Sequence, residues 1–324
     1  LLLSALKISL TFSLFYETGV TRISPRLDKG RRSPYNKEAK FECRKRECGG
    51  KRMNQPLVSV VIPAYNGGKT LKKCLNSVLC QSYSHIQVIV VNDGSTDDTG
   101  ALLDAYAARD HRVLALHQQN AGVSAARNTA LAYCEGVYVQ FVDCDDTLPP
   151  DSIRTMVTRA EADDSDLVIG AYNMVLGNLS ETKDLGKRSD TLSMDEFLAL
   201  LCKYPNTFYY GVLWNKLFRR ELIAQQNVQF NAALAWGEDF DFITRYLVQA
   251  ERISYTRQVV YEYVRNPKGL TMKTGFGVVK HPIRAIELKR IIYNNYRELY
   301  RQRQAFERHR RDIWKYMVSF TLTE

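Results

Sequence analysis

The chain has 324 residues, 45% of them hydrophobic and 25% charged, a normal globular composition and a length that fits one large or two modest domains. Its net charge of +10 comes from the two ends, because residues 1–52 carry 13 Lys or Arg against 5 Asp or Glu, and residues 280–324 carry 11 against 5. Basic ends on a mildly acidic middle argue against nucleic acid as a partner, and they fit an anionic membrane surface or plain solvation.

The seven cysteines limit the class of protein further. Their number is odd, they include no C-x-x-C pair, and no His stands at finger-like spacing from them. We therefore expect neither a zinc site nor a disulfide framework, and we interpret the cysteines as reduced thiols of a cytoplasmic protein.

The N-terminal segment, residues 1–54, is left out of the predicted fold. Its first sixteen residues are largely apolar, but they are fewer than the roughly 20 that span a bilayer, and Lys7 interrupts them. They could be the remnant of a signal peptide, an amphipathic anchor or sequence upstream of the true start. The basic stretch that follows is typical of a disordered linker.

From residue 55 onward, short apolar runs alternate with helical periods, which predicts an α/β domain with a mainly parallel sheet. In chain order we expect a strand at 58–62, a helix with its apolar face at 71–79, a strand at 86–91, a helix at 98–109, a strand at 113–116, a helix at 123–134, a strand at 138–142, a helix begun near 149–150 and a strand at 166–170. This order predicts a doubly wound sheet with helices on both faces, whose ligands bind beyond the carboxyl ends of the strands. The pattern weakens after residue 180, and residues 280–324 form a helical tail dense in Arg and Tyr.

An acidic cluster, Asp143-Cys144-Asp145-Asp146, directly follows the predicted strand at 138–142. Its three carboxylates repel one another, so burying them together is costly unless a cation or hydrogen-bond donors compensate. Oxygen ligands suit magnesium or manganese, ions that usually keep waters and bridge to phosphates. The residues alone leave a second interpretation open, because the same carboxylates could cap a helix that starts after them.

Two further polar positions could serve a nucleotide. Asp93 lies in an N-D-G-S sequence, which is a good turn by itself, but its carboxylate could also accept from a base N–H or a ribose hydroxyl. No G-x-G-x-x-G follows either of the first two strands, which argues against a dinucleotide fingerprint. Arg127 is either a solvated helical arginine or a group that neutralises a diphosphate or stacks on a base.

Later positions are more ambiguous. Glu238 and Asp239 precede an apolar helical face, where they would make an ordinary acidic helix start. Trp214 and Lys216 could contact an acceptor or a phosphate, although Trp214 suits a core position equally well.

Seven segments, in order, resemble the motifs of family 2 glycosyltransferases, which have the GT-A fold. They are VSVVIPAYN (58–66), VIVVNDGSTDDT (88–99), NAGVSAARNTAL (120–131), YVQFVDCDDTLPPD (138–151), and three that resemble blocks of the bacterial polysaccharide members, LWNKLFRRELI (213–223), WGEDFDF (236–242) and YEYVRNPKGLT (261–271). The resemblance implies a GT-A-like domain over residues 55–271, with a nucleotide-sugar half at about 55–170 and an acceptor half at about 171–271. The helical basic tail would then be 272–324.

The resemblance also implies roles for individual residues. Those matching the donor site are Pro63, Ala64, Tyr65, Asn66, Asp93, Arg127, Asp143 and Asp145. Asp143 and Asp145 match the D-x-D pair that contacts the ribose and a divalent metal, manganese or magnesium, and Asp146 beside them is a further metal ligand. Asp239 matches the catalytic base, with Glu238 as its neighbour.

The activity implied is inverting transfer of a hexose from a UDP-sugar to a glycan or lipid-linked acceptor in cell-surface polysaccharide synthesis. We expect such an enzyme in the cytoplasm, peripheral at the inner face of the plasma membrane through its tail, since Arg and Tyr suit an anionic interface. One alternative is a catalytically silent subunit that binds nucleotide-sugars, against which the intact Asp145 and Asp239 weigh. A nucleotidyltransferase is the other, but Gly67-Gly68-Lys69 only faintly resembles its phosphate loop.

Overall fold

The computed structural model describes residues 55–177, 179–184, 191–203, 211–234, 237–265 and 282–313. The apolar start and basic linker, Trp236 of the W-G-E-D segment, and residues 266–271 of the last motif lie outside the described residues.

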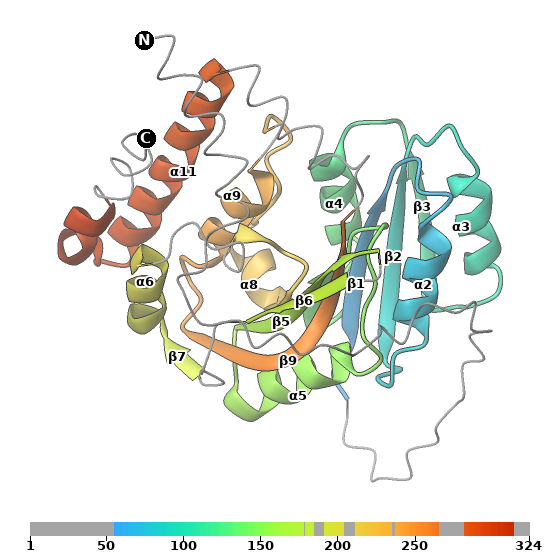
Figure 1. Cartoon of the computed structure of the whole chain (residues 1–324), viewed down its shortest axis with the longest axis horizontal. Coiled ribbons are helices and arrows are strands. Elements are labelled where there is room, and N and C mark those ends of the chain that lie inside the picture. Colours follow the sequence, from blue (N-terminus) through green and yellow to red (C-terminus); the bar gives the residue numbers. More distant parts are fainter. Residues whose placement is uncertain are drawn as a thin grey trace.

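One nine-stranded sheet organises the described residues, in the order β3-β2-β1-β4-β8-β5-β9-β7, with β6 paired to β5 (Figure 1). The strands are β1 (Val58–Ala64), β2 (Ile86–Asp93), β3 (Val113–Gln118), β4 (Tyr138–Phe141), β5 (Leu167–Leu176), β6 (Leu179–Lys183), β7 (Thr191–Ser193), β8 (Lys216–Arg219) and β9 (Arg252–Val264). The helices are α2 (Leu71–Leu79), α3 (Thr99–Ala107), α4 (Val123–Leu131), α5 (Ser152–Asp163), α6 (Met194–Lys203), α8 (Arg220–Gln225), α9 (Glu238–Tyr246) and α11 (Pro282–Gln302).

The first four strands confirm the predicted doubly wound half. β1 pairs in parallel with β2 and β4, and β2 pairs in parallel with β3. The connections run outward through α2 and α3 and then return through α4 to the other side of β1 (Figure 1). Strand order therefore reverses between β1 and β4, and the carboxyl ends of these two strands form the crevice in which ligands of such sheets bind.

The second half of the sheet is mixed. The predicted strand at 166–170 is the start of the longer β5, and it does not neighbour β4, because the antiparallel β8 lies between them. β5 also pairs in parallel with β9, with a bulge near Gly170 and Ala171. Both predicted halves thus contribute strands to one sheet, and the division near residue 170 stays a prediction.

An aromatic cluster joins α9 to the sheet. Phe141 of β4 packs edge-on against Phe218, Phe230 and Phe242, with ring centroids 5.7, 5.5 and 5.6 Å away. The rings of Phe230 and Phe242 are stacked at 4.3 Å. Since edge-to-face and offset-stacked rings at these separations are favourable, the cluster fixes α9 beside the carboxyl end of β4.

The predicted basic tail is in part a packed helix. On α11, Tyr296 and Tyr300 are only 2% and 0% exposed, and Tyr296 contacts Phe240 of α9 at 5.0 Å between centroids. These tyrosines are core residues, so the expectation that they face a membrane interface is wrong. The arginines Arg290, Arg301, Arg308, Arg310 and Arg311 of this segment remain exposed.

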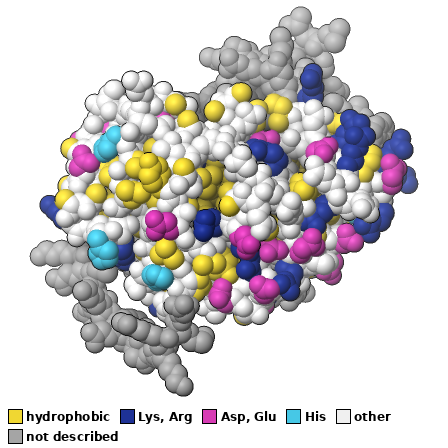
Figure 2. Space-filling model, turned by 180° about the vertical axis from the view of Figure 1, so that it is seen from behind, with side chains coloured by type: hydrophobic (Ala, Val, Ile, Leu, Met, Phe, Trp, Pro, Cys, Tyr) yellow, Lys and Arg dark blue, Asp and Glu magenta, His cyan; other side chains and the backbone are white. Residues whose placement is uncertain are grey.

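The described surface carries charges of both signs. On the face shown in Figure 2, described Lys and Arg side chains are interspersed with Asp and Glu side chains. None of the helices in the described ranges combines the length and the apolar run needed to cross a bilayer.

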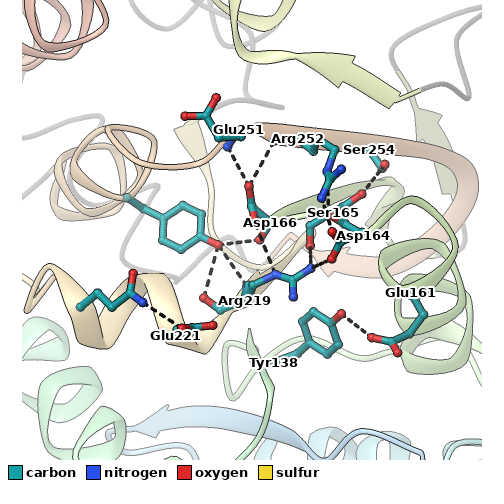
Figure 3. Close-up of polar contacts among 12 residues, drawn as sticks. Tyr138, Glu161, Asp164, Ser165, Asp166, Arg219, Glu221, Glu251, Arg252 and Ser254 are labelled. Carbon is teal, nitrogen blue, oxygen red and sulfur yellow. Dashed lines mark hydrogen bonds and ion pairs between the residues drawn. The ribbon is translucent and has the colours of Figure 1, made fainter.

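A polar network closes the end of the sheet opposite the carboxyl ends of β1 and β4 (Figure 3). Arg219 pairs with Asp164 at 2.7 Å and with Asp166 at 3.3 Å, and Arg252 also pairs with Asp164. The hydroxyl of Tyr246 accepts from the Arg219 backbone N–H at 3.0 Å and donates to the Asp166 carbonyl. The C-terminal end of α9 is therefore tied to β5 and β8.

Candidate active site

Arg127, in the second turn of α4, is the centre of the candidate site. Its guanidinium donates to Asp239 Oδ1 at 2.6 Å, to Glu238 Oε1 at 3.4 Å and to Asp143 Oδ1 at 3.1 Å. The residue is 4% exposed, so the alternative of a solvated helical arginine is wrong. One guanidinium thus brings together three segments that are separate in sequence, and the opposite charges compensate the cost of burial.

Asp239 lies in the first turn of α9, where the helix dipole favours a carboxylate. The helix is preceded by Gly237 at a φ of 82°, a left-handed conformation that glycine adopts without strain. Burial raises the pKa of Asp239 to about 7, Arg127 opposes this rise, and the charges of Glu238 and Asp143 add to it. Because 22% of the Asp239 side chain stays exposed, a substrate can reach this carboxylate, whose pKa suits a general base.

Asn128, a residue that the sequence analysis did not single out, holds Phe230 against Arg127. Its Nδ2 donates to the Phe230 carbonyl at 2.8 Å, and its Oδ1 accepts from the Phe230 N–H at 2.7 Å. The Phe230 ring then lies 5.3 Å from the centre of the Arg127 guanidinium. The only signal in the sequence was the neighbouring A-R-N, which gives no hint of a partner about a hundred residues away.

The acidic turn 143–146 does not cap a helix. The next helix, α5, begins at Ser152, and its N-cap position is Asp151, so that interpretation of the cluster is wrong. The turn is instead closed by the Asp146 N–H, which donates to the Asp143 carbonyl at 3.1 Å.

The three acids of the turn have different environments. Asp143 pairs with Arg127, whereas Asp146 is 1% exposed and its oxygens accept from the Tyr261 hydroxyl at 2.8 Å and the Val264 N–H at 2.7 Å. Asp145 forms no ion pair with any residue in the described ranges. Burial, followed by repulsion from Asp143, raises the pKa of Asp145 to about 6. Burial and the two neighbouring acids also raise the pKa of Asp146, well above its usual range, but Asp146 already has two hydrogen-bond donors. Asp145 is therefore the acid of the turn best placed to take a cation.

The loop after β1 carries the predicted donor residues Pro63, Ala64, Tyr65 and Asn66. Pro63 and Ala64 end the strand and are buried, while the side chain of Tyr65 is 53% exposed. Asn66 Oδ1 accepts from the Thr96 N–H at 2.8 Å, which ties this loop to the one after β2. The Tyr65 side chain is thus outside the core and accessible just beyond the carboxyl end of β1.

Asp93 is 3% exposed and organises the loop that leads into α4. Its Oδ1 accepts from Gln118 Nε2 at 2.7 Å and the Ala121 N–H at 2.9 Å, and its Oδ2 accepts from the Gly122 N–H at 2.9 Å. The sequence analysis missed this role. A contact between Asp93 and a nucleotide stays a prediction, and it would have to use the lone pairs that these donors leave.

Lys216 and Trp214 are buried. Lys216 is 0% exposed, its Nζ donates to Asn215 Oδ1 at 2.9 Å, and burial holds its pKa well below the usual range despite the charge of Asp239. Trp214 is 3% exposed and stacks on Tyr261 at 4.5 Å between centroids. The core alternative therefore holds for Trp214.

Comparison with known proteins identifies the family. The model of the family described as glycosyl transferase family 2 matches residues 59–225. EpsJ of Bacillus subtilis, an uncharacterized glycosyltransferase, is 31% identical over 243 residues, which are 74% of this chain and 71% of that protein. The chain belongs to glycosyl transferase family 2.

Two further comparisons concern this family 2 glycosyltransferase. YibD of Escherichia coli, another uncharacterized glycosyltransferase, is 32% identical over 211 residues, 64% of this chain and 60% of its own. The crystal structure of S. aureus TarS 1-349 in complex with UDP-GlcNAc superposes with a TM-score of 0.58 at 20% identity, over 82% of this chain and 81% of that one. At that identity the likeness concerns the fold alone, and it confirms the predicted GT-A type.

The candidate site of this glycosyltransferase offers few protein ligands to a divalent cation. Within the described ranges, no three Asp, Glu, His or Cys side chains converge as a metal cage. Asp143 and Asp146 are engaged elsewhere, which leaves Asp145. Since magnesium is usually bound through one or two carboxylates together with substrate phosphates, the residues suit an ion that arrives with a nucleotide. The set of three metal ligands expected from the sequence, Asp143, Asp145 and Asp146, stays a prediction.

Proposed function

We propose that this family 2 enzyme transfers a hexose from a UDP-sugar to a glycan or lipid-linked acceptor, with inversion, in the synthesis of a cell-surface polysaccharide. The observation that carries the proposal is the bridge from Asp143 through Arg127 to Asp239, with Nη–O distances of 3.1 and 2.6 Å. One guanidinium thus contacts both the expected ribose-binding residue and the expected base. The crystal structures of TarS in complex with UDP and with UDP-GlcNAc support the class of donor.

Asp239 is the proposed general base. An acceptor hydroxyl is a poor nucleophile, so a carboxylate must take its proton while its oxygen attacks the anomeric carbon. A new bond forms between that oxygen and the carbon, the bond from the carbon to the β-phosphate oxygen breaks, and its electron pair leaves with UDP. Attack opposite the leaving group inverts the anomeric centre. A pKa of about 7 leaves Asp239 partly ionised near neutral pH and able to accept the proton.

The remaining residues of the site bind and orient the donor. We assign the uracil and ribose to Pro63, Ala64, Tyr65, Asn66 and Asp93, with Asp143 at the ribose and Arg127 near the diphosphate. Asp145 would hold manganese or magnesium against the diphosphate, and the ion supplies positive charge as UDP departs. Glu238 assists by sharing Arg127 with the base.

The test is a thermal-shift screen of UDP-sugars with manganese, followed by assays of UDP release. We expect Asp145→Ala to lose turnover, and Asp239→Asn to lose turnover while it still binds UDP. Undiminished turnover in Asp239→Asn would remove the proposed base. Binding of UDP-sugars without release of UDP in any acceptor mixture would favour the silent subunit, and release of pyrophosphate would favour the nucleotidyltransferase.

An anionic membrane surface is the proposed partner of the exposed arginines in the helical segment 306–313, which follows α11, notably Arg310 and Arg311. Each basic side chain near such a surface contributes about 1 kcal/mol. Deleting the whole tail would also remove Tyr296 and Tyr300 from the core. Co-sedimentation with phosphatidylserine vesicles should therefore compare the wild type with Arg310→Glu/Arg311→Glu. Equal binding at low salt would count against this partner.

A further inference from the structure

The Tyr261 hydroxyl and the Asp146 carboxylate link the end of β9 to the acidic turn. The Tyr261 hydroxyl accepts from the Asp143 N–H at 3.1 Å and donates to Asp146 Oδ2 at 2.8 Å. Asp146 Oδ1 in turn accepts from the Val264 N–H at 2.7 Å. These contacts tie together positions that are more than a hundred residues apart, and Asp143, one of the two arms of the Arg127 bridge, is held by its own backbone.

Thr147, the residue after the acidic turn, and Glu262 of β9 form a second set of contacts between the same two segments. The Glu262 N–H donates to the Thr147 carbonyl at 2.9 Å, and the Thr147 N–H donates to the Glu262 carbonyl at 3.3 Å. Thr147 Oγ1 also donates to Glu262 Oε2 at 3.0 Å. The Tyr261 ring is clamped by stacking on Trp214, with the planes 18° apart. The hydroxyl of Tyr261 therefore has little freedom to leave Asp146.

Building on the glycosyltransferase function proposed above, we propose that Tyr261 and Asp146 are positioning residues for the donor site, and that Asp146 is not a metal ligand. They hold the turn so that Asp143 meets Arg127 and Asp145 is left for the cation. Asp146 is 1% exposed, whereas an ion that keeps waters and bridges to phosphates needs an open face. If Asp146 turned toward an ion, the half-buried Val264 N–H and the buried Tyr261 hydroxyl would be left without acceptors, which is costly.

Four substitutions separate positioning from metal ligation. Tyr261→Phe removes the fastening hydroxyl and touches no carboxylate. Tyr246→Phe is its matched control, because that hydroxyl is equally buried and also accepts a backbone N–H, but at the opposite end of the sheet. Asp146→Asn removes the charge, while its oxygen still accepts from the Val264 N–H and its amide can donate to the Tyr261 hydroxyl, so that the bond between these two side chains is reversed and not lost. Asp145→Asn removes the charge expected to bind the cation.

The first measurement is amide hydrogen exchange on the full chain without ligand. We expect peptides covering 143–147 and 261–264 to exchange about tenfold faster in Tyr261→Phe than in Tyr246→Phe, because the Asp143 N–H loses its acceptor and Asp146 loses one of the two donors that tie it to β9. Unchanged protection of both peptides in Tyr261→Phe would overturn the positioning role, whatever the enzyme binds.

The second measurement is manganese binding in the presence of UDP, followed by the electron paramagnetic resonance signal of free manganese. We expect affinity to fall about tenfold in Tyr261→Phe and more in Asp145→Asn, but to stay within about threefold of wild type in Asp146→Asn and Tyr246→Phe. Loss in Asp146→Asn as large as in Asp145→Asn, with Tyr261→Phe unaffected, would make Asp146 a ligand and overturn the proposal. Failure of the wild type to bind manganese with UDP would count against the proposed function, and hydrogen exchange would still decide the positioning role.

Discussion

Replacing Arg127 with Met tests how the site controls the protonation of Asp239. The guanidinium lies 2.6 Å from Asp239 Oδ1. Its charge lowers the pKa of Asp239 while burial and two neighbouring carboxylates raise it, and the net pKa is about 7. An opposite charge at such a distance lowers a carboxyl pKa by about 1 to 3 units. Without it, the ionised fraction of Asp239 at neutral pH should fall from about one half to about one tenth or less.

The assay is kcat/KM as a function of pH. Because a base must be ionised to act, the wild-type rate should rise with pH through about 7 and then level off. In Arg127→Met the rise should move to higher pH, so that the loss is about tenfold or more near pH 7 and shrinks in alkaline solution. A loss by the same factor at every pH would refute the reasoning, since Arg127 would then act on the charge of the donor and not through Asp239.

Arg127→Lys is the matched control for charge. A lysine keeps one positive charge but cannot bridge two carboxylates as a planar guanidinium does, so the shift in pH dependence should be smaller. Arg127→Met breaks the ion pairs, and breaking a buried pair lowers the free energy of unfolding by about 3–5 kcal/mol. We expect the low end or less, because the side chains of Asp143 and Asp239 keep 32% and 22% of their surface exposed. Thermal unfolding of each variant establishes the temperature below which the kinetics are measured on folded protein.

Two predictions concern the packing that positions the site. In Gly136→Ala the new Cβ would lie 2.5 Å from the Ser59 nitrogen and 2.7 Å from the Tyr138 oxygen, both backbone atoms, so we expect a loss of about 1–3 kcal/mol or more in urea unfolding. Stability equal to that of the wild type would show that β1 and β4 can separate there. Tyr296→Ala should cost about 3–5 kcal/mol because it empties a buried aromatic position against α9. A change below about 0.5 kcal/mol, typical of surface substitutions, would mean that α11 is only a loosely attached tail.

The sequence could predict the parallel half of the fold because its signals are local. Continuous apolar runs mark β1, β2 and β4, which are covered by helices on both sides of the sheet. The mixed half could not be ordered in the same way. β8 has only four residues, and its place between β4 and β5 depends on cross-strand pairs such as Val139 with Phe218. No periodicity in residues 213–223 reveals that partner.

The candidate site also combines residues that a local motif predicts with contacts that depend on distant segments. Asp143, Asp145, Arg127 and Asp239 were each predicted from a motif, and the structure brings Arg127, Asp143 and Asp239 together. What could not be predicted is which acid of the turn faces which partner, because that depends on Tyr261 and Val264 of β9. Asp93 was likewise expected to contact a nucleotide. The three groups that donate hydrogen bonds to its carboxylate could not be inferred from a turn sequence alone.

The position of the proposed base depends on apolar packing as much as on charge. Asp239 is carried by α9, and α9 is placed by Phe242, which stacks on Phe230 at 4.3 Å and meets Phe141 of β4 at 5.6 Å. Phe230 is itself held by Asn128, the residue next to Arg127. The guanidinium and the helix that it must reach are therefore located by the same ring. A relative that kept every charged residue of the motifs but lost this aromatic cluster would have no reason to keep Asp239 within hydrogen-bonding distance of Arg127, so the charged motifs alone do not establish an active site.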